Sequence, residues 1–349
     1  MLRNKNKMLY RLPAEWEEQK STIIGWPYNK NDWPKRFDNI PSVFAKIISK
    51  ISYYQKVNIL INDNKSKKDI ILLLKKFKSK LKNIRYIACK TDRVWMRDTG
   101  PIFLKNKKNK NVLCNWKFNG WAKYTNHKND DKVNFRIRKY FNSEIINPKH
   151  KKKRVILEGG SIDVNGRGLM LTTRECLLSK IQQRNLNFKI NDYEKIFERF
   201  FGIHHIIWLN KGIKGDDTHG HVDDIARFVD RNKIFIAYEK NKKDHNYRIL
   251  KENLILLKKK RNNYLNLKIK KIPMPRPIYI DKTRVPASYL NFYITNKLVL
   301  LPIFNDPNDK IVINIFKKEF KKRKIIPIDC SELIWGLGAI HCMTQQEPS

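Results

Sequence analysis

Short runs of β-branched and apolar residues alternate along the chain with longer amphipathic stretches. VNILIN at 57–62 precedes KKDIILLLKKFKSKL at 67–81, and KIFIAY at 233–238 precedes NYRILKENLILLKKK at 246–260. Runs of four to eight apolar residues are typical of strands, whereas apolar positions three and four apart over a longer stretch are typical of helices. The pattern predicts a mixed α/β fold throughout.

The spacing of these elements gives no sign of a domain boundary. No Gly/Ser- or Pro-rich linker divides the chain, we find no sequence repeat, and the lysine-rich stretch 142–154 is predicted to be a surface loop. The chain has 349 residues, a length that single domains built from repeated α/β units do reach. We expect one domain over residues 1–349.

The charge is extreme, with 74 Lys and Arg against 33 Asp and Glu and a formal net charge of +41. Such a balance first suggests nucleic acid or an anionic membrane as the partner. However, the basic runs at 149–154 and 317–324 lack interleaved aromatic residues and match no nucleic-acid-binding motif. We therefore expect a solvated basic surface, with no specific nucleic acid and no membrane as partner.

The cysteines and the N-terminus bear on the compartment. The five cysteines are odd in number and form no CxxC pair, which argues against a disulfide framework or a thiolate zinc site. The N-terminal stretch has no apolar signal region, and no segment holds eighteen uninterrupted apolar residues. A soluble, cytoplasmic protein is predicted.

Glycine, proline and acidic residues gather in a few segments, where chemistry is most to be expected. If their carboxylates converge, they form a pocket for a cation, and a planar guanidinium with its fixed fork of donors suits paired carboxylates best. An isolated Asp would more often cap a turn. The carboxylates concerned are Asp92, Asp98, Glu158, Asp216, Asp217, Asp223 and Asp224.

The segment HGHVDD allows two chemistries. If it is a strand, alternation places His219, His221 and Asp223 on one face. An H-x-H-x-D set could hold a metal, with His204 and His205 completing the shell, or it could provide a general acid/base beside a substrate-binding carboxylate. We favour a hydrogen-bonded structural role for His219 and expect no metal.

Cys342 is the candidate nucleophile, because His341 lies beside it in a glycine-containing stretch. Most cysteines are small buried hydrophobes, and a reactive thiol needs a nearby positive charge, which a histidine or a bound guanidinium would supply. The other four are predicted to be packing residues in apolar stretches without a base: Cys89, Cys114, Cys176 and Cys330.

Taken together, these segments resemble the agmatine deiminases of the wider peptidyl-arginine deiminase family. The similarity runs almost end to end through RLPAEWEEQKSTIIGWPYN, WMRDTGPIF, NWKFNGWAKY, LEGGSIDVNGRGLMLTTRECLL, GDDTHGHVDD, ASYLNFYITN, LLPIFNDPND and GLGAIHCMTQQEP. The resemblance implies a five-bladed α/β propeller of ββαβ units, pentein-like, with an axial active site. It also implies that no metal or other cofactor takes part.

The resemblance assigns a role to each matching residue. Cys342 is then the nucleophile and His221 the general acid/base, while Glu158 orients and polarises His221. Asp98 and Asp223 bind the guanidinium nitrogens. The residues implied to line the substrate pocket are Trp95, Trp121, Asn291, Gly159 and Asp217.

The spacing of five of these residues fits one contribution per blade. From 98 to 158, 221, 291 and 342 the steps are 60, 63, 70 and 51 residues. The implied reaction is attack of the Cys342 thiolate on the guanidinium carbon, loss of ammonia to give a covalent thiouronium, and hydrolysis to a ureido product. With agmatine the product is N-carbamoylputrescine, on a route to putrescine.

The chain departs from the family pattern at Ala339, where a polar residue is usual, and at His219. The substrate is therefore less firmly indicated than the reaction. Agmatine suits an acidic pocket mouth, expected from Asp216, Asp217 and Asp224. Free or peptide-linked arginine would need a basic partner for a carboxylate, such as Arg93 or Arg97. The two remaining alternatives are an H-x-H-x-D metallohydrolase and a basic nucleic-acid-binding protein. A homo-oligomer is expected from the resemblance.

Overall fold

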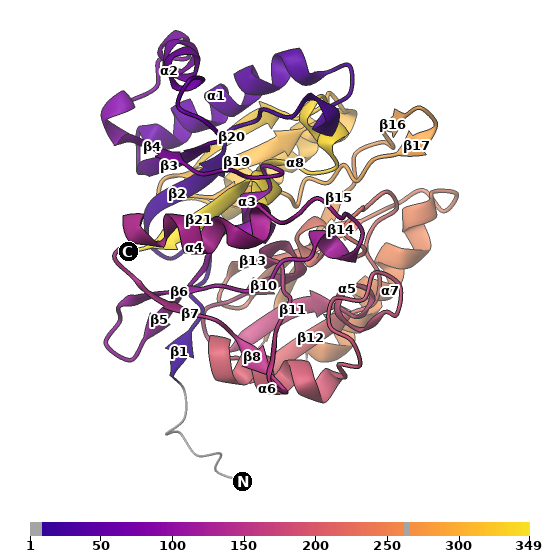
Figure 1. Cartoon of the computed structure of the whole chain (residues 1–349). Helices are drawn as coiled ribbons and strands as arrows, with labels where there is room; N and C mark the ends of the chain where they lie inside the picture. Colours follow the sequence, from indigo (N-terminus) through magenta and orange to yellow (C-terminus); the bar gives the residue numbers. More distant parts are fainter. Residues whose placement is uncertain (1–8, 262–265) are drawn as a thin grey trace.

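The computed structural model describes residues 9–261 and 266–349, and most of this chain belongs to five small sheets (Figure 1). In the order in which their strands lie side by side, the sheets are β1 (Tyr10–Arg11), β5 (Ile102–Asn106), β6 (Asn111–Cys114) and β7 (Glu144–Ile146); β10 (Ile162–Val164), β11 (Leu169–Thr173) and β12 (His205–Leu209); β13 (Ala226–Asp230), β14 (Lys233–Tyr238) and β15 (Lys268–Pro273); β18 (Tyr293–Ile294), β19 (Leu298–Ile303) and β20 (Lys324–Asp329); and β21 (Thr344–Pro348), β2 (Gln19–Gly25), β3 (Lys56–Ile61) and β4 (Ile84–Ala88). Two short hairpins join β8 (Lys149–His150) to β9 (Lys153–Arg154) and β16 (Tyr279–Ile280) to β17 (Thr283–Arg284).

The same pairing recurs in the five sheets, an antiparallel pair followed by a parallel neighbour. In one sheet Ala226 of β13 lies opposite Ile236 of β14, and Ile234 of β14 pairs in parallel with Ile269 of β15. An antiparallel pair needs only a tight turn, whereas a parallel neighbour needs a crossover, here a helix. Each sheet is thus a ββαβ unit.

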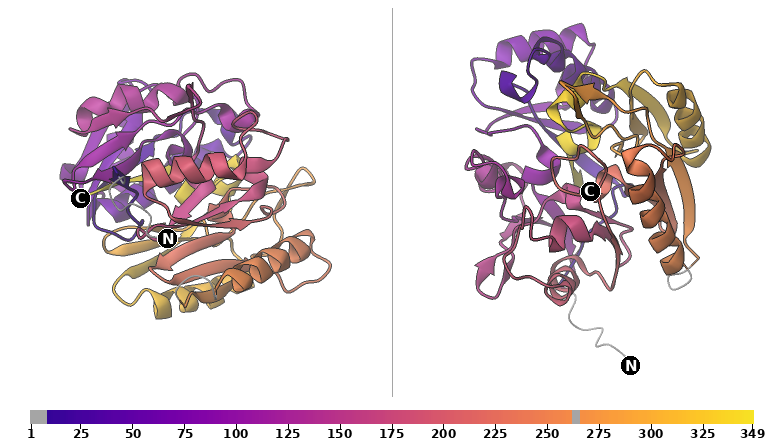
Figure 2. Two further views of the ribbon diagram at one scale, coloured as in Figure 1. Left: turned by 90° about the horizontal axis from the view of Figure 1, so that it is seen from below. Right: turned by 90° about the vertical axis from the view of Figure 1, so that its right-hand side faces the viewer.

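The helices are α1 (Ile40–Ser52), α2 (Lys67–Lys76), α3 (Met96–Thr99), α4 (Val133–Ile137), α5 (Arg174–Leu178), α6 (Ile190–Phe201), α7 (His245–Arg261), α8 (Pro307–Glu319) and α9 (Ile340–Met343). Their ends follow local rules: Asp306 caps α8, and Gly202 ends α6 in the left-handed conformation at φ 68°. One face of each longer helix is buried, as with Phe197 and Phe201 of α6. In Figure 2 the long helix α7, in orange, lies on the outside of the molecule, against its own sheet.

The N-terminal sheet is completed by the C-terminal strand. β21 pairs antiparallel with β2, Ile24 lying opposite Thr344, and Figure 1 shows the yellow strand beside the indigo one. β2, β3 and β4 then run parallel, with α1 and α2 in the crossovers. Segments from the two ends of the sequence therefore share one sheet and one core, in which Ile24, Val57 and Met343 are buried.

Several predicted elements are confirmed, namely strands at 56–61 and 233–238 and helices at 67–76 and 245–261. Helix α2 ends at Lys76, before the predicted end at residue 81, because Lys78 takes a left-handed conformation, φ 54°. The prediction of a loop at 142–154 is wrong, since β7 lies within it and pairs with β6, and β8 and β9 form a hairpin there. Within the described ranges, none of the helices combines the length and apolar character needed to cross a bilayer.

Candidate active site

Five segments meet where the first strand of each ββαβ unit begins. α3 precedes β5, residues 158–161 precede β10, and residues 221–224 precede β13. Asn291 precedes β18, and α9 precedes β21. Contacts join α3 to α9 and to residues 159–161, and these in turn to residues 222–224. The structure thus gathers one segment from each sheet around a common point, as the spacing in the sequence predicted.

Asp98, on α3, is a buried carboxylate held by two donors. Trp121 Nε1 donates to its Oδ2 at 2.9 Å, and the backbone N–H of Gly160 donates to its Oδ1 at 3.0 Å. Burial raises the pKa of Asp98 above its ordinary value, with nearby Asp223 and Glu158 adding to the effect and His221 opposing it. A cation that arrives here would be strongly favoured, because it would offset this crowding of negative charge.

His221 lies between two carboxylates. Its Nδ1 is 3.8 Å from Asp98 Oδ2, and its Nε2 is 3.7 Å from Glu158 Oε2. Neither ring nitrogen has a hydrogen-bond partner among the described residues. Burial opposes the imidazolium, but Asp98 and other neighbours outweigh it, so that the pKa of His221 is raised well above the ordinary value. The imidazole is placed to hold a proton at the centre of the site.

Glu158 is kept ionised by an arginine that the sequence did not reveal. Arg184 Nε donates to Glu158 Oε1 at 3.0 Å, and both side chains are fully buried. Although burial raises the pKa of Glu158, Arg184 and His221 outweigh it and bring the pKa down to about 2. No motif marks Arg184, which occurs in a polar stretch 26 residues after its partner.

Asp223, the second predicted guanidinium ligand, is held in place by the ring of His341. His341 Nδ1 lies 2.7 Å from Asp223 Oδ2, and His341 Nε2 lies 2.7 Å from Glu15 Oε2. Glu15 also binds Arg97 and Arg227 and accepts the N–H of Ile294. His341 therefore positions the carboxylate of Asp223. Its ring contacts do not support the expectation that it activates Cys342 directly.

The other oxygen of Asp223, Oδ1, has no hydrogen-bond partner among the described residues, although it is buried. An unpaired carboxylate oxygen in this setting is costly, so it invites a donor from a ligand. His341 lowers the pKa of Asp223 by hydrogen bond and charge against the opposing effect of burial.

Cys342 lies on α9 and is held by one amide. Asn291 Nδ2 lies 3.1 Å from the Cys342 sulfur, and Asn291 Oδ1 accepts the N–H groups of His341 at 2.9 Å and of Cys342 at 3.2 Å. The sulfur also lies 3.9 Å from Asp223 Oδ2. Burial, together with Asp223, Asp224 and Asp98, raises the pKa of the thiol well above its ordinary value.

Cys342 and Asp98 open into one cavity of about 370 Å³. Trp95, Trp121 and Asp217, which were predicted to line a substrate pocket, line this cavity. Further lining residues, among them Asp32, Tyr124 and Asn126, were not foreseen as such. Arg93, which was considered only as a partner for a carboxylate, lines the cavity as well.

Asp32 is the unexpected acidic group of this cavity. Its Oδ1 accepts from Asn29 at 3.2 Å, whereas its Oδ2 is buried without a hydrogen-bond partner among the described residues. Burial raises the pKa of Asp32 to about 6, and Arg93 works against the shift. Nothing in the stretch YNKNDW distinguishes this carboxylate from a turn residue.

Other predicted site residues lie elsewhere. Gly159 does not line the cavity, because its Cα faces Arg97, whose carbonyl oxygen would be 2.3 Å from an added Cβ. The neighbouring Gly160 is the glycine on which the site depends, since a Cβ there would lie 2.5 Å from His221 Nδ1 and 2.9 Å from Asp98 Oδ1. Asn291 supports Cys342 and is not part of the cavity wall.

The prediction that Asp216, Asp217 and Asp224 form an acidic mouth of the cavity is partly wrong. Asp216 does not line the cavity but accepts the N–H groups of Thr218, Gly220 and His221, and so shapes the loop that carries His221. Asp224 is buried and accepts from Asn291 at 2.9 Å. Of the three residues predicted for the mouth, Asp217 alone lines the cavity, where it binds Lys123 and Tyr124.

The strand expected at HGHVDD does not exist. Residues 222–224 form a 3-10 helix after a loop in which His219 and Gly220 have positive φ angles, 62° and 96°. His219 turns away to Ser179 at 3.2 Å, which confirms the structural role favoured for it. His205 is the first residue of β12, and His204 directly precedes the strand. The H-x-H-x-D metal set is therefore not assembled.

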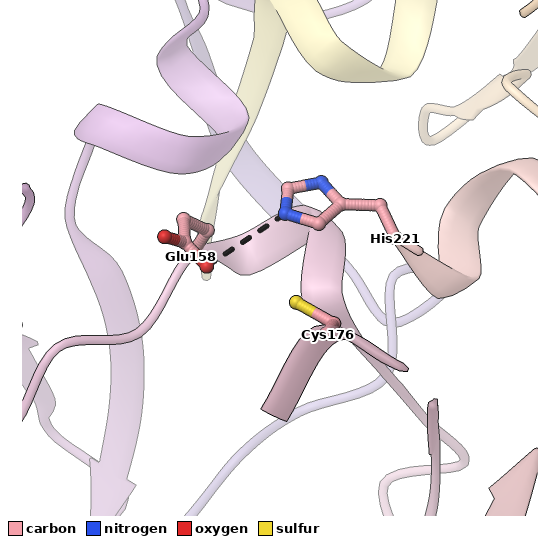
Figure 3. Close-up of side chains that lie close together, drawn as sticks. All are labelled: Glu158, Cys176 and His221. Carbon is pink, nitrogen blue, oxygen red and sulfur yellow. Dashed lines mark ion pairs between the residues drawn. The ribbon is translucent and has the colours of Figure 1, made fainter. Parts of the chain in front are cut away.

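Cys176 does not fit the prediction of a cysteine without a base. One ligand atom from each of Glu158, Cys176 and His221 lies within 4.8 Å of the other two. Figure 3 shows the three side chains converging, with the sulfur below the imidazole ring. The sequence signal was absent because Cys176 and His221 come from different sheets.

The chain is similar over nearly its whole length to solved agmatine deiminases. A curated Latilactobacillus sakei relative, provisionally named an agmatine deiminase, is 31% identical over 97% of this chain and 96% of its own length. A solved C. jejuni agmatine deiminase, in which one cysteine is replaced by serine and substrate is bound, is 29% identical with a TM-score of 0.87, over 100% of this chain and 99% of that one.

A second solved structure, titled as the agmatine deiminase of Enterococcus faecalis catalysing its reaction, is 26% identical with a TM-score of 0.87, over 97% of this chain and 96% of that one. A sequence model of the Porphyromonas-type peptidyl-arginine deiminases matches residues 11–348. The chain belongs to the Porphyromonas-type peptidyl-arginine deiminase family.

Proposed function

We propose that the protein hydrolyses a guanidino compound, most of all agmatine, to a ureido product and ammonia through a covalent intermediate on Cys342. The observation that carries the proposal is the placement of one buried thiol in a cavity with Asp98, while its sulfur lies 3.9 Å from Asp223. A planar cation between two carboxylates would present its central carbon to the sulfur.

The first half-reaction forms a carbon–sulfur bond and breaks a carbon–nitrogen bond. The Cys342 thiolate adds to the guanidinium carbon, and the imidazolium of His221 gives its proton to one terminal nitrogen, which leaves as ammonia. A thiouronium cation stays on the sulfur, and its charge remains matched by Asp98 and Asp223. Glu158 holds the imidazole in place from the opposite side.

The second half-reaction reverses these roles. The now neutral His221 takes a proton from water, and the hydroxide adds to the thiouronium carbon. The sulfur then leaves as thiolate, the proton of the new hydroxyl group passes to solvent, and the ureido product departs neutral. Loss of positive charge releases the product, because Asp98 and Asp223 no longer face a cation.

Substrate charge also activates the nucleophile. Without a cation, burial and the surrounding carboxylates hold Cys342 as the neutral thiol. A guanidinium between Asp98 and Asp223 offsets those carboxylates, so the thiol loses its proton to solvent as substrate binds. Neutral ligands would leave the thiol unreactive, and selectivity for cations then arises at the chemical step as well as in binding.

Agmatine is favoured by Asp32. Its buried Oδ2 lacks a partner in the cavity that holds Cys342, and the far end of agmatine is an ammonium group. Trp95 and Trp121 supply apolar walls for the methylenes between the two charged ends.

Free or peptide-linked arginine is the second candidate substrate, favoured by the position of Arg93 in the same cavity. Both terminal nitrogens of Arg93 already donate to Asn126 at 2.9 Å, and its guanidinium stacks 4.3 Å above the ring of Tyr124. The other arginine considered, Arg97, is buried against Glu15 and Gln346 and does not line the cavity.

The arrangement of the five sheets around the site also supports the proposed function. We infer that the five ββαβ sheets surround the site as blades of a propeller, because each delivers the start of its first strand to the same point. An axial position lets five segments distant in sequence converge without long loops.

The experiment that tests the proposal is ammonia release from agmatine, arginine and an arginyl peptide by purified protein, with and without a chelator. We expect agmatine to be turned over fastest, with no effect of the chelator and complete loss on thiol alkylation. Activity that the chelator removes would support a metallohydrolase instead, and absence of ammonia from all three substrates would refute the proposal.

A further inference from the structure

Three potential metal ligands lie together, and one of them, His221, is the proposed general acid. Cys176 is on α5, where Thr173 fixes the start of the helix by accepting the Cys176 N–H at 3.1 Å. Glu158 and His221 come from the neighbouring segments, and one atom of each residue lies within 4.8 Å of the others. All three side chains are buried, and Figure 3 shows them pointing toward one another.

Two of the three carry buried polar atoms without a hydrogen-bond partner among the described residues, Glu158 Oε2 and His221 Nε2. They lie 3.7 Å apart, too far for a hydrogen bond. Two ligands bound to one tetrahedral zinc at about 2.0–2.2 Å lie about 3.3–3.6 Å from each other. The pair is therefore spaced almost as a zinc ion would space it, and the sulfur, within 4.8 Å of both atoms, needs to move inward by at most about 1 Å.

We propose that Glu158, Cys176 and His221 form a binding site for a zinc ion, and that zinc bound there inhibits the enzyme. The mixed set of sulfur, nitrogen and oxygen suits zinc and is unlike the all-oxygen sets that magnesium and calcium take. Arg184 binds the other oxygen of Glu158, Oε1, at 3.0 Å, so Oε2 is the oxygen left for the metal and the carboxylate is already oriented.

The site differs from the nucleophile and from the substrate cavity. None of its three residues lines the cavity, whereas Cys342 does. Zinc on His221 Nε2 would hold the imidazole that the proposed reaction needs for proton transfer, while Asp98 and Asp223 remain open to the substrate. Inhibition should therefore lower kcat more than it raises KM. This inhibitory effect rests on the proposed function, whereas the binding of metal does not.

Binding is tested with cadmium, whose bond to a thiolate absorbs in the ultraviolet. The full-length Cys342→Ser protein, which lacks the nucleophilic thiol, should give a charge-transfer band that saturates at one equivalent. The band should disappear in Cys342→Ser/Cys176→Ser and persist in the matched control Cys342→Ser/Cys330→Ser, since Cys330 is a buried cysteine outside the cluster. A band that survives loss of Cys176, or its absence in Cys342→Ser, would overturn the site.

Two further measurements keep the test independent of how the double variants fold. Crystals of Cys342→Ser soaked in zinc should show an anomalous peak between Glu158, Cys176 and His221, and a peak elsewhere or none would overturn the proposal. In activity assays normalised to each protein's own rate, Cys176→Ser should need at least roughly 10- to 100-fold more zinc for half-inhibition. If zinc occupies the cluster but leaves turnover unchanged, the site stands and the role proposed for His221 fails.

Discussion

Replacing Asp32 by Asn removes the charge that we assign to the far ammonium of agmatine and leaves the shape of the side chain nearly unchanged. The carboxylate lines the cavity, and its Oδ2 has no partner among the described residues. Substrates with the ammonium should lose affinity, whereas a guanidine with a plain alkyl chain should not.

The magnitude follows from the partial burial of Asp32. Two unit charges about 4 Å apart attract by about 4 kcal/mol at an effective dielectric constant near 20. Dehydration of the ammonium opposes this attraction. Exposed ion pairs contribute about 0.2–1 kcal/mol, whereas loss of one partner of a buried ion pair costs about 2–5 kcal/mol. We expect about 1–2 kcal/mol for Asp32, or a fall of about 5- to 30-fold in kcat/KM for agmatine.

The assay compares agmatine with butylguanidine, which keeps the reacting group and lacks the amine. Asp32→Asn should reduce kcat/KM for agmatine mainly through KM, and butylguanidine should change by less than about 2-fold. Asp38→Asn is the matched control, because Asp38 is an exposed acidic residue six positions away that does not line the cavity.

The pH dependence gives an independent reading. Burial raises the pKa of Asp32 to about 6, and Arg93 works against the shift, while the charge of Asp32 in turn raises the pKa of Tyr28 and of Tyr124. The carboxylate is therefore neutralised as pH falls from 7 to 5, and KM for agmatine should rise over this window in wild type but not in Asp32→Asn. Butylguanidine should show no such difference between the two proteins.

Asp32→Asn should weaken agmatine binding but increase the stability of the fold. A folded-state pKa above the unfolded value near 3.9 means that ionised Asp32 destabilises the fold, an effect absent below pH 4 and fully present above pH 6. Asp32→Asn should stabilise the protein by about 1–2 kcal/mol at pH 7, allowing for partial exposure, and raise its melting temperature. Equal losses on agmatine and butylguanidine, or a loss of stability, would refute the reasoning.

Three further predictions concern the reaction itself. Cys342→Ser should fold and bind agmatine but lose nearly all turnover, because an alcohol lacks the acidity and softness of a thiol. Asp98→Asn should cost about 2–5 kcal/mol in kcat/KM, whereas Asp92→Asn should mainly affect stability, since the Asp92 carboxylate accepts bonds from residues 129 and 130 and does not line the cavity. Asp216→Ala should reduce kcat, since its carboxylate holds the N–H of His221, whereas Asp217→Asn should act mainly through KM.

Each of these has a contrary outcome. Ammonia release by Cys342→Ser above a few per cent of the wild-type rate, in the presence of chelator, would contradict the covalent mechanism. Equal kinetic effects at Asp98 and Asp92 would mean that the guanidinium binds elsewhere. An Asp216→Ala enzyme with wild-type kcat, measured under saturating agmatine, would show that the loop keeps its shape without the carboxylate.

The elements that the sequence predicted well are those governed by local pattern. KIFIAY forms β14 with the predicted ends, since five of its six residues are apolar. The segment 142–154 was misjudged because β7 exists only through pairing with β6, some thirty residues earlier. In HGHVDD, alternation of types suggested a strand, but the positive φ angles at His219 and Gly220 and the bonds to Asp216 override it.

For the site, the sequence identified the residues to which we assign the chemistry and missed those that hold them in place. Asp98, His221 and Cys342 stand in distinctive segments, and the structure brings them together. Arg184 and Asp32 could not be found, because their importance depends on partners and burial that only the assembled sheets create.

The pairing of β21 with β2 fixes when the enzyme becomes competent during synthesis. Cys342 leaves the ribosome after the four other segments that surround it, and only then can its strand cover the open edge of the first sheet. A nascent chain that ends before α9 and β21 lacks the proposed nucleophile and exposes the edge of β2, on which chaperones or like chains can dock. If Cys342 has the proposed role, completion of the sheet and the appearance of reactivity belong to the same last step of synthesis.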